Sequence, residues 1–424
     1  MHIKELTLIN FRGAANLTLN FDKKLNVLVG VNGAGKSSIL DACSIMLSRL
    51  VSRIKTGRAT GRAINVTDIR NSTSYAQLEI TLLTDEHEEI SWSIHKERIG
   101  SNDRNRTRSL QKLAEYADIL QEQIKQTNGN INLPVLVYYP VNRAVVDIPL
   151  RIRKKHSFEL LSTYEDSLTV AANFRTFFEW FREREDIENE KKNSNRDFEY
   201  RDLQLQAVRQ ALSQFMPEFS NIRIRRSPLR MDVDKTINGN KTTLNISQLS
   251  DGEKCLMAMV GDIVRRMTIA SPVLPDPLQG QGVIIIDELD LHLHPMLQRE
   301  VISRLVETFP NCQFIISTHS PHIITHVKTE SLFFLDVTAD GLRSEHPQKS
   351  YGMTAERVLE DLMGLPTTRP VSIKNKIDDI YQRIDRKEYD KAKKAIFQLE
   401  RKIGADPDLL RARTIIMRKE AIGK

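Results

Sequence analysis

The chain has 424 residues, with 40% hydrophobic and 28% charged side chains and a formal net charge of +7. These values fit a globular protein built as one large domain with insertions or as two domains. No apolar run reaches the roughly eighteen residues of a transmembrane helix, so no membrane span is expected. The three cysteines, Cys43, Cys255 and Cys312, are far apart, which argues against disulfides and for a reducing cytoplasm.

The positive charge is unevenly distributed along the chain. Residues 371–424 carry 15 Lys and Arg against 9 Asp and Glu, a surplus of 6 that is nearly the whole net charge. Smaller basic clusters lie at residues 53–70, 98–112, 151–155 and 223–230. Such clusters suit nucleic acid, an acidic partner or a solvated helix face, and all three interpretations stay open.

The first 140 residues alternate between strand and helix patterns. Residues 2–9 and 16–21 predict two strands joined by a turn at residues 11–13. An apolar strand at 25–29, a Gly-rich loop and a helix over 38–50 follow. The pattern then predicts a basic loop over 48–74, strands at 76–84 and 89–95, a helix at 110–126 and a strand at 133–139.

The Gly-rich loop, Gly30 to Ser37, reads GVNGAGKS and fits the phosphate-binding pattern G-x-x-x-x-G-K-[ST] at every fixed position. Its glycines let backbone N–H groups point at a phosphate chain, and the helix that follows adds its positive end. Lys36 would reach the β and γ phosphates, and Ser37 would ligate Mg²⁺. A chance Gly-rich turn is the alternative, but the strand–loop–helix context favours a nucleoside triphosphate.

Residues 158–216 change the pattern and predict a helical hairpin inserted into the nucleotide-binding fold. The break between its two helices is expected at residues 191–196, which contain two asparagines and a serine. Apolar side chains recur at helical spacing at Phe174, Phe177, Phe178 and Phe181. This stripe favours a packing seam over a ligand site.

The rest of the chain returns to strands and then becomes helical. The patterns predict strands at 222–226, 231–233, 283–286, 313–317 and 331–336, and helices at 296–308 and from near Cys255 to Met267. After Pro370 the chain is basic and helical, with Ile373, Ile377 and Ile380 at helical spacing. These residues predict a small helical bundle.

Two further motifs carry chemistry. Val283 to Glu288, reading VIIIDE, brings two acids to the end of a buried strand, where Asp287 can hold Mg²⁺ and Glu288 can take a proton from water. Leu249 to Lys254, reading LSDGEK, precedes a helix whose N-terminus can bind an anion. For LSDGEK the alternative is a plain Ser250 N-cap with Glu253 in the first turn.

These motifs, together with the histidine of ISTHSP, resemble the ABC-type ATPases of the SMC/RecF/OLD-like group over roughly residues 1–340. The resemblance implies an α/β fold with an ABC-type P-loop NTPase head, ATP and Mg²⁺ as cofactors, and two heads that sandwich ATP. It implies that Glu288 and His319 are catalytic and that Ser37 and Asp287 hold the metal. The implied signature residues, acting in trans, are Ser250, Asp251, Gly252 and Glu253. The implied nucleotide-binding residues are Arg12, Asn32, Gly33, Ala34, Gly35, Lys36, Ser37 and Ser38.

The overall plan resembles the PtuA family, the ATPase subunits of Septu and retron-associated anti-phage defence systems. The implied partners are a second copy of the chain, a separate HNH nuclease, and a retron reverse transcriptase with its multicopy single-stranded DNA/RNA. The expected division is an N-terminal part of the head (1–150), a hairpin insert (151–218), a C-terminal part of the head (219–345) and a helical tail for docking or oligomerisation (346–424).

One segment departs from the family pattern, and two other features argue against a metal cluster and against a nuclease. The segment YYPVNRAV, residues 138–145, lacks the glutamine expected after its strand, so Asn142 or Arg143 is a candidate substitute. His292, His294, His319, His322 and His326 make a metal cluster conceivable, but no neighbouring cysteine completes a set. The D-x-D at residues 406–408 follows no apolar strand, so no nuclease is expected within this chain.

Three functions therefore compete. The first is a defence ATPase that dimerises around ATP and controls a separate nuclease. The second is a RecF-like repair or recombination ATPase that acts directly on DNA through its basic clusters. The third is a scaffold whose ATP is mainly structural.

Overall fold

The sheet that carries the phosphate-binding loop has six strands in the order β13-β12-β3-β11-β10-β6. Their bounds are β3 Leu25–Val29, β6 Val135–Tyr139, β10 Gly282–Ile286, β11 Cys312–Ser317, β12 Leu332–Thr338 and β13 Gly341–Glu345. All are parallel except β13, which pairs antiparallel with β12. Every residue of β6, β10 and β11 is buried, as expected for apolar strands covered on both faces.

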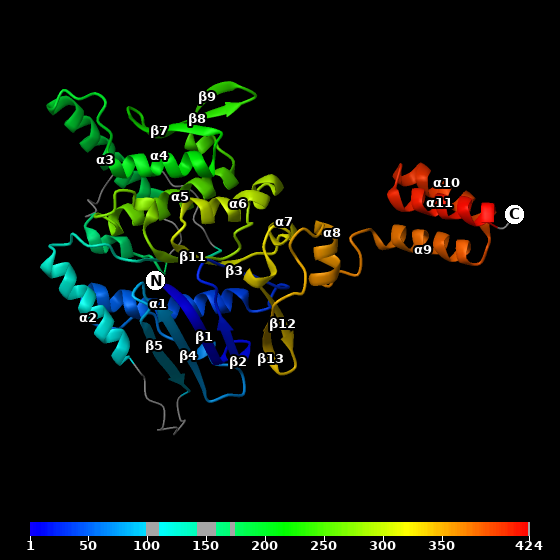
Figure 1. Ribbon diagram of the computed structural model, residues 1–424, viewed down its shortest axis with the longest axis horizontal. Helices are drawn as coiled ribbons and strands as arrows, with labels where there is room; N and C mark the ends of the chain where they lie inside the picture. The colour runs from blue at the N-terminus through cyan, green and yellow to red at the C-terminus, as the bar shows by residue number, and fades with distance from the viewer. Residues whose placement is uncertain (99–109, 142–157, 170–173, 423–424) are drawn as a thin grey trace. The chain divides into compact units, whose positions relative to one another are not determined.

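The computed structural model describes residues 1–98, 110–141, 158–169 and 174–422 (Figure 1). The chain divides into two units, which we call the head, residues 1–353, and the tail, residues 354–424. Among the described residues, no helix is long and apolar enough to cross a membrane.

A second, antiparallel sheet lies on the other side of the first long helix. Its order is β2-β1-β4-β5, with β1 His2–Phe11, β2 Ala14–Asn20, β4 Tyr75–Leu83 and β5 Glu89–Glu97. The helix α1, Lys36–Thr56, contacts β4 of this sheet and β6, β10 and β11 of the central one, so it is buried between them. The helix α2, Gln111–Gln126, packs on α1 and β5.

The inserted helices and a third sheet gather on one side of the head, away from the second sheet (Figure 1). The insert supplies α3 Phe174–Ser194 and α4 Leu203–Phe215. The head itself adds α5 Asp251–Ala270, α6 Pro295–Thr308 and the short α7 Pro321–Ile324. The sheet has the order β7-β8-β9, with β7 Phe219–Arg226, β8 Leu229–Ile237 and β9 Asn240–Asn245. The helical hairpin predicted from the sequence is therefore confirmed as α3 and α4, but the break between them lies at residues 195–202 and not at 191–196.

The aromatic stripe of α3 is a packing seam, as its spacing predicts. Phe177, Phe178 and Phe181 are fully buried, and Phe174 is nearly so. A Cβ at Gly261 of α5 would lie 2.8 Å from the Phe177 ring, so that glycine lets the two helices approach closely. Helix α5 is thereby fixed against the insert.

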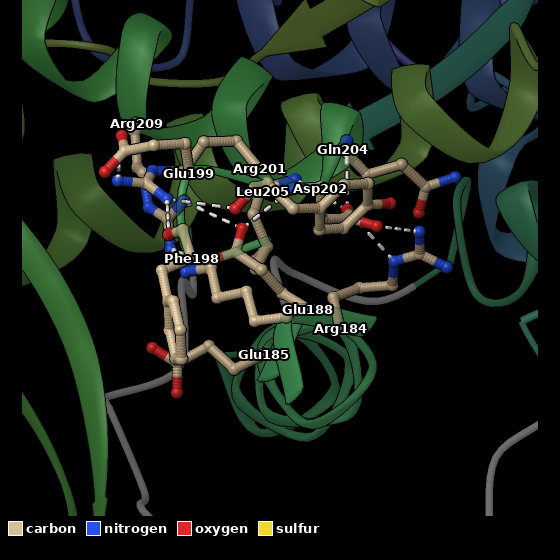
Figure 2. Close-up of polar contacts among 12 residues, drawn as sticks. Arg184, Glu185, Glu188, Phe198, Glu199, Arg201, Asp202, Gln204, Leu205 and Arg209 are labelled. Carbon is tan, nitrogen blue, oxygen red and sulfur yellow. Dashed lines mark hydrogen bonds and ion pairs between the residues drawn. The ribbon is translucent and has the colours of Figure 1, made fainter. Parts of the chain in front are cut away.

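A network of charges closes the hairpin between α3 and α4 (Figure 2). Asp202 caps α4 by accepting hydrogen bonds from the N–H groups of its first turn, and Arg184 of α3 pairs with it. Glu188 accepts the Asp202 N–H at 2.8 Å, Arg209 at 3.1 Å and Lys192 at 2.9 Å. Burial alone would raise the pKa of Glu188, but these donors outweigh it and lower the pKa to about 2.

Some boundaries differ from the predicted ones for identifiable reasons. Helix α1 continues to Thr56, beyond the predicted end at residue 50, and stops at Gly57, whose φ of 72° provides a left-handed cap. Helix α5 begins at Asp251, not near Cys255, because Ser250 caps it. Strands β9 and β13 were not predicted from the sequence, because most residues of β9 are exposed and β13 is short and largely polar.

The tail is a small helical bundle, which confirms the prediction for the end of the chain. Its elements are the short α8 Ala355–Arg357, α9 Val371–Asp385, α10 Tyr389–Ile403 and α11 Pro407–Ile422. The core residues are Ile377, Ile380, Ile384, Ala392, Ile396, Leu399, Leu409, Ala412 and Ile416. The carboxylates of Asp406 and Asp408 pair with Arg369 at 2.7 and 3.0 Å.

Candidate nucleotide site

Three strand ends bring the sequence motifs to one edge of the central sheet. In the parallel register Leu28 of β3 lies opposite Ser317 of β11, and Ile316 lies opposite Ile286 of β10. The residues that follow these strands therefore emerge side by side. They are the phosphate-binding loop, the Thr318–His319 segment and the Asp287–Glu288 pair, and this edge is where ligands bind in open α/β sheets.

The loop places Lys36 beneath an open backbone cradle. The Lys36 Nζ donates to the carbonyl oxygens of Gly30 at 2.9 Å and Val31 at 3.1 Å, and the residue is only 5% exposed. Burial lowers the pKa of Lys36, while nearby Asp287, Glu288 and Asp290 act to raise it. The acids of β10 and the lysine of the loop are thus within electrostatic reach of one another.

The start of α1 suits a phosphate chain. The N-cap residue of this helix is Gly35, which has no side chain to cap it, so the first N–H groups lack the partner that such a cap would supply. Gly35 stands at φ 83° as the N-cap residue, a conformation that favours glycine, and a Cβ on Gly33 would meet no atom within 4 Å. Asn32, Gly33 and Ser37 are exposed, Gly35 and Ser38 are half-buried and Ala34 is buried. Backbone donors beside a buried ammonium group form a donor set that fits ATP phosphates.

One serine organises the two acids after β10. The Ser317 hydroxyl donates to the carboxylate of Asp287 and accepts the Glu288 N–H at 2.8 Å. Glu288 has a φ of 47°, a left-handed conformation that costs a non-glycine residue about 1 kcal/mol or more. Residues held in such conformations are concentrated at active sites, so the geometry of Glu288 supports a functional role. Ser317 was not among the predicted site residues, although its polarity after the apolar run of β11 was a signal.

His319 is held by Asp290. The Thr318 hydroxyl donates to Asp290 at 2.5 Å, and the His319 N–H donates to the same carboxylate oxygen at 3.2 Å. Burial and the charge of Lys36 lower the pKa of His319, although the three acids of the site act to raise it. A lowered pKa favours the neutral imidazole at pH 7. The bond between Asp290 and this loop was not predicted from the sequence.

Arg12 lies beside the site but is held by carboxylates of its own chain. Its guanidinium pairs with Asp41 of α1 at 2.5 Å and with Asp68 at 2.9 Å. Burial raises the pKa of Tyr138 and Asp287 adds to this, while Arg12 opposes it. Arg12 and Asp287 therefore both lie within electrostatic reach of the Tyr138 hydroxyl. The structure positions Arg12 against the first turns of α1.

The LSDGEK segment forms the capped start of α5. Ser250 accepts the Glu253 N–H at 3.4 Å, and Glu253 accepts the Ser250 N–H at 2.9 Å. Ser250 and Asp251 are exposed, whereas Gly252 is buried, with the His292 carbonyl oxygen only 2.2 Å from where a Cβ would be. Among the described residues, no hydrogen bond or ion pair joins this segment to Gly30–Ser37. The N-cap role is thus present, and the segment also faces solvent.

A buried ion network links α5 to the end of β6. Asp262 is fully buried and pairs with Arg265 at 2.7 Å and Arg266 at 2.8 Å. The Tyr139 hydroxyl donates to the same carboxylate at 2.9 Å. Burial alone would raise the pKa of Asp262, but the two guanidinium groups outweigh it and lower the pKa. Helix α5 is thereby tied to strand β6 of the central sheet.

The substitutes for the missing glutamine and the histidines were the remaining candidates from the sequence. Asn142 and Arg143, the candidate substitutes for the missing glutamine, lie outside the described residues. In the part of the chain that the structure describes, no group of three or more His, Cys, Asp or Glu side chains could hold a metal ion as a set. The histidine cluster is therefore not assembled there.

Comparison with known proteins identifies the class. The family profile described as "AAA domain, putative AbiEii toxin, Type IV TA system" matches residues 25–325, and the chain belongs to this family. It shares 30% identity over 432 residues with "Retron Ec83 probable ATPase" of Escherichia coli, covering 87% of this chain and 77% of that protein.

The resemblance to PtuA is also confirmed. "Septu protein PtuA" of Bacillus thuringiensis is 27% identical over 407 residues, covering 94% of this chain and 93% of that protein. The chain is thus an SMC/RecF-like ABC-type ATPase related to PtuA. A solved SMC head bound to the C-terminal winged-helix domain of ScpA has a TM-score of 0.48 and 17% identity, covering 81% of this chain and 98% of that one.

Proposed function

We propose that this chain is the ATP-binding and ATP-hydrolysing subunit of an anti-phage defence complex that controls a separate HNH nuclease. The observation that carries the proposal is the meeting of Lys36, Asp287, Glu288 and His319 at one edge of the sheet. Relatives named as Septu and retron proteins support the defence role.

Each residue of the site has a role that its surroundings support. The N–H groups of Asn32 to Ser38 cradle the phosphates, and Lys36 exchanges its loop carbonyls for β- and γ-phosphate oxygens. Ser37 and Asp287 would hold Mg²⁺, which would neutralise phosphate charge when bound. Glu288 accepts a proton from the attacking water, and neutral His319 contacts the γ-phosphate.

A second copy completes the site. Ser250 and Asp251 are exposed at the N-terminus of α5, where backbone N–H groups and the helix dipole favour an anion. Helix α1 of the same chain already has its own phosphate cradle, so α5 serves the γ-phosphate held by another head. Gly252 and Glu253 shape this surface, since Gly252 abuts His292 and Glu253 closes the cap.

ATP binding and hydrolysis control the association of two copies of this chain. Two heads close around ATP and part after hydrolysis, and ATP shifts that balance through its different affinity for the two states. Cleavage then belongs to a separate HNH subunit, because the D-x-D of the tail is engaged by Arg369 and follows no sheet strand. A reverse transcriptase with its multicopy DNA is a further partner in the cytoplasm.

Co-purification tests this proposal. The chain is expressed with the products of its neighbouring genes, and the mass of the complex is measured with and without ATP. The proposal predicts a complex with an HNH protein and at least two copies of this chain. A monomer that captures no neighbouring product in either condition would contradict it.

A RecF-like role in DNA repair is the second candidate. RecF of Halothermothrix orenii is 28% identical over 156 residues, but this covers only 37% of the chain. The match to PtuA extends over 94% of the chain and therefore favours the defence role. A gene neighbourhood of replication and repair genes, without an HNH gene, would reverse this preference.

A further inference from the structure

A groove with basic walls runs between α9 and α10 of the tail. Its volume is about 360 Å³. Ile380 and Leu399 form its floor and are 1% and 3% exposed, so the bundle itself already covers their apolar surface. Asp379 is the single carboxylate among the lining residues. The cations that line it, which define the basic groove, are Lys376, Arg383, Lys391, Lys394 and Lys402.

Three of the five cations of the basic groove have no carboxylate partner within the tail as far as residue 422. Lys376, Lys394 and Lys402 make no ion pair or hydrogen bond within the tail as far as residue 422. In contrast, Lys393 pairs with Glu420, and Lys419 with Asp385, where α11 packs on the other helices. The other two groove cations are paired, Arg383 with Asp379 at 2.8 Å and Lys391 with Glu388 at 3.2 Å. Unpaired lysines gathered in one groove repel one another and create a positive potential that favours a polyanion.

An exposed aromatic ring lies on α10, next to one of the groove lysines. Phe397 on α10 is 58% exposed, although apolar side chains of this size are usually covered. It lies three residues after Lys394 and four before Arg401, so the three side chains are neighbours on the helix surface. An exposed ring flanked by cations is the arrangement on which nucleobases stack.

We propose that the basic groove binds the phosphate backbone of single-stranded nucleic acid, with Phe397 stacking on a base at its rim. Lys391 and Lys402 lie about 16 Å apart along α10, at 1.5 Å per residue, so the wall follows several phosphates. A protein partner fits less well because the groove offers charge without the exposed apolar centre of protein interfaces. A duplex fits less well because its bases are stacked within it and unavailable to Phe397.

This binding is independent of the nucleotide site. The tail has its own core and forms a unit separate from the head. The contacts involve phosphates and one stacked base, so binding is predicted to depend on salt and to be tolerant of sequence. Failure of the groove experiment would leave the proposed ATPase function intact, and loss of ATP binding would leave the groove intact.

The test measures binding of the full-length chain to a fluorescent single-stranded DNA of mixed sequence by anisotropy, without nucleotide and over a range of salt concentrations. The groove variant replaces Lys376, Lys394 and Lys402 by glutamine. Its affinity is expected to fall about tenfold or more, and the slope of log K against log salt to become shallower by about 2.

A matched control replaces Lys374, Lys393 and Lys419 by glutamine, which removes the same charge from the bundle outside the groove. The control is expected to keep its affinity within about twofold and its salt slope unchanged. Circular dichroism checks that both variants remain helical. Equal loss in the two variants, or no loss in the groove variant, would overturn the assignment of the groove.

Two further measurements test the class of ligand. Phe397→Ala is expected to lose about fivefold or more in affinity while keeping the wild-type salt slope, because stacking releases no counterions. Unchanged affinity would overturn the stacking contact. A duplex and polyglutamate of equal charge are expected to bind more weakly than the single strand, and tighter binding of either would overturn the single-strand assignment.

Discussion

Replacement of Glu288 by glutamine isolates the proton-accepting role of that residue. Glutamine keeps the size of the side chain and leaves the backbone free to hold φ near 47°, with the N–H bonded to Ser317 at 2.8 Å. The substitution therefore removes one charge and one proton acceptor and leaves the loop, Lys36 and Asp287 in place. ATP binding is expected to survive, and the closed dimer is expected to accumulate.

The expected loss of ATP hydrolysis rate follows from the role of Glu288 as a general base. A positioned general base contributes about 10²- to 10⁴-fold to a rate, which corresponds to about 3–5 kcal/mol of barrier. Steady-state phosphate release at saturating ATP measures the loss, and equilibrium binding of a fluorescent ATP analogue checks that the site is intact. Glu307→Gln, an exposed acid of α6, is the matched control and should hydrolyse ATP at the wild-type rate.

Two results would refute the assignment. Equal turnover in the wild type and Glu288→Gln would show that another group accepts the proton. If Glu288→Gln lost both ATP binding and turnover, the result would show that Glu288 shapes the site and does not act on water.

Three further changes test other parts of the account. Lys36→Ala should abolish binding of a fluorescent ATP analogue, because the ammonium group that faces the phosphates is lost; wild-type affinity would contradict its role. Glu188→Ala should lower the free energy of unfolding in urea by about 2–4 kcal/mol, because the Arg209 guanidinium and the Asp202 N–H lose their acceptor. Glu190→Ala, at an exposed position of the same helix, should change this free energy little. Because the pKa of Glu188 is lowered in the folded state, its contacts stabilise the fold fully at pH values above its ordinary pKa of 4.5. The difference in unfolding free energy between these two variants should therefore shrink as pH falls from 4.5 toward 2. Asp262→Asn should lower the free energy of unfolding by about 3–5 kcal/mol in the same assay, because two buried arginines lose the carboxylate with which they pair. A smaller loss of unfolding free energy than that of Glu190→Ala would refute this.

The sequence predicts the elements whose pattern is local. The loop of Gly30–Ser37, the VIIIDE strand and the hairpin insert each carry their signal within a few residues, and the structure has all three elements. The parallel order of β3, β11 and β10 then brings their ends together. Buried parallel strands are near-continuous apolar runs, and ligands bind beyond their carboxyl ends, so the polar residues that follow such runs mark a candidate site.

The contacts that fix the site were not predictable in the same way. Arg12 meets Asp41 and Asp68, which are 29 and 56 residues away in the chain. Ser317 holds the backbone of Glu288, 29 residues before it. Such pairs depend on how loops are folded onto a sheet, and no local periodicity encodes them. The proposed trans role of Ser250 could be predicted only from the family resemblance, because it requires a second molecule.

Mixing two inactive variants tests the central claim that each site is shared between two copies. Lys36→Ala disables the phosphate-binding side of a site, and Ser250→Arg disables the signature side. Alone, each should hydrolyse almost no ATP. Mixed, a heterodimer joins the intact loop of one chain to the intact Ser250 of the other.

Random pairing makes half of the dimers mixed, with one intact site of two, so the mixture should recover about a quarter of the wild-type rate. Steady-state ATP hydrolysis by the equimolar mixture is the measurement. Recovery to about that level is the result that the shared site predicts. Full activity of Ser250→Arg alone, or a mixture no more active than the sum of its parts, would contradict it.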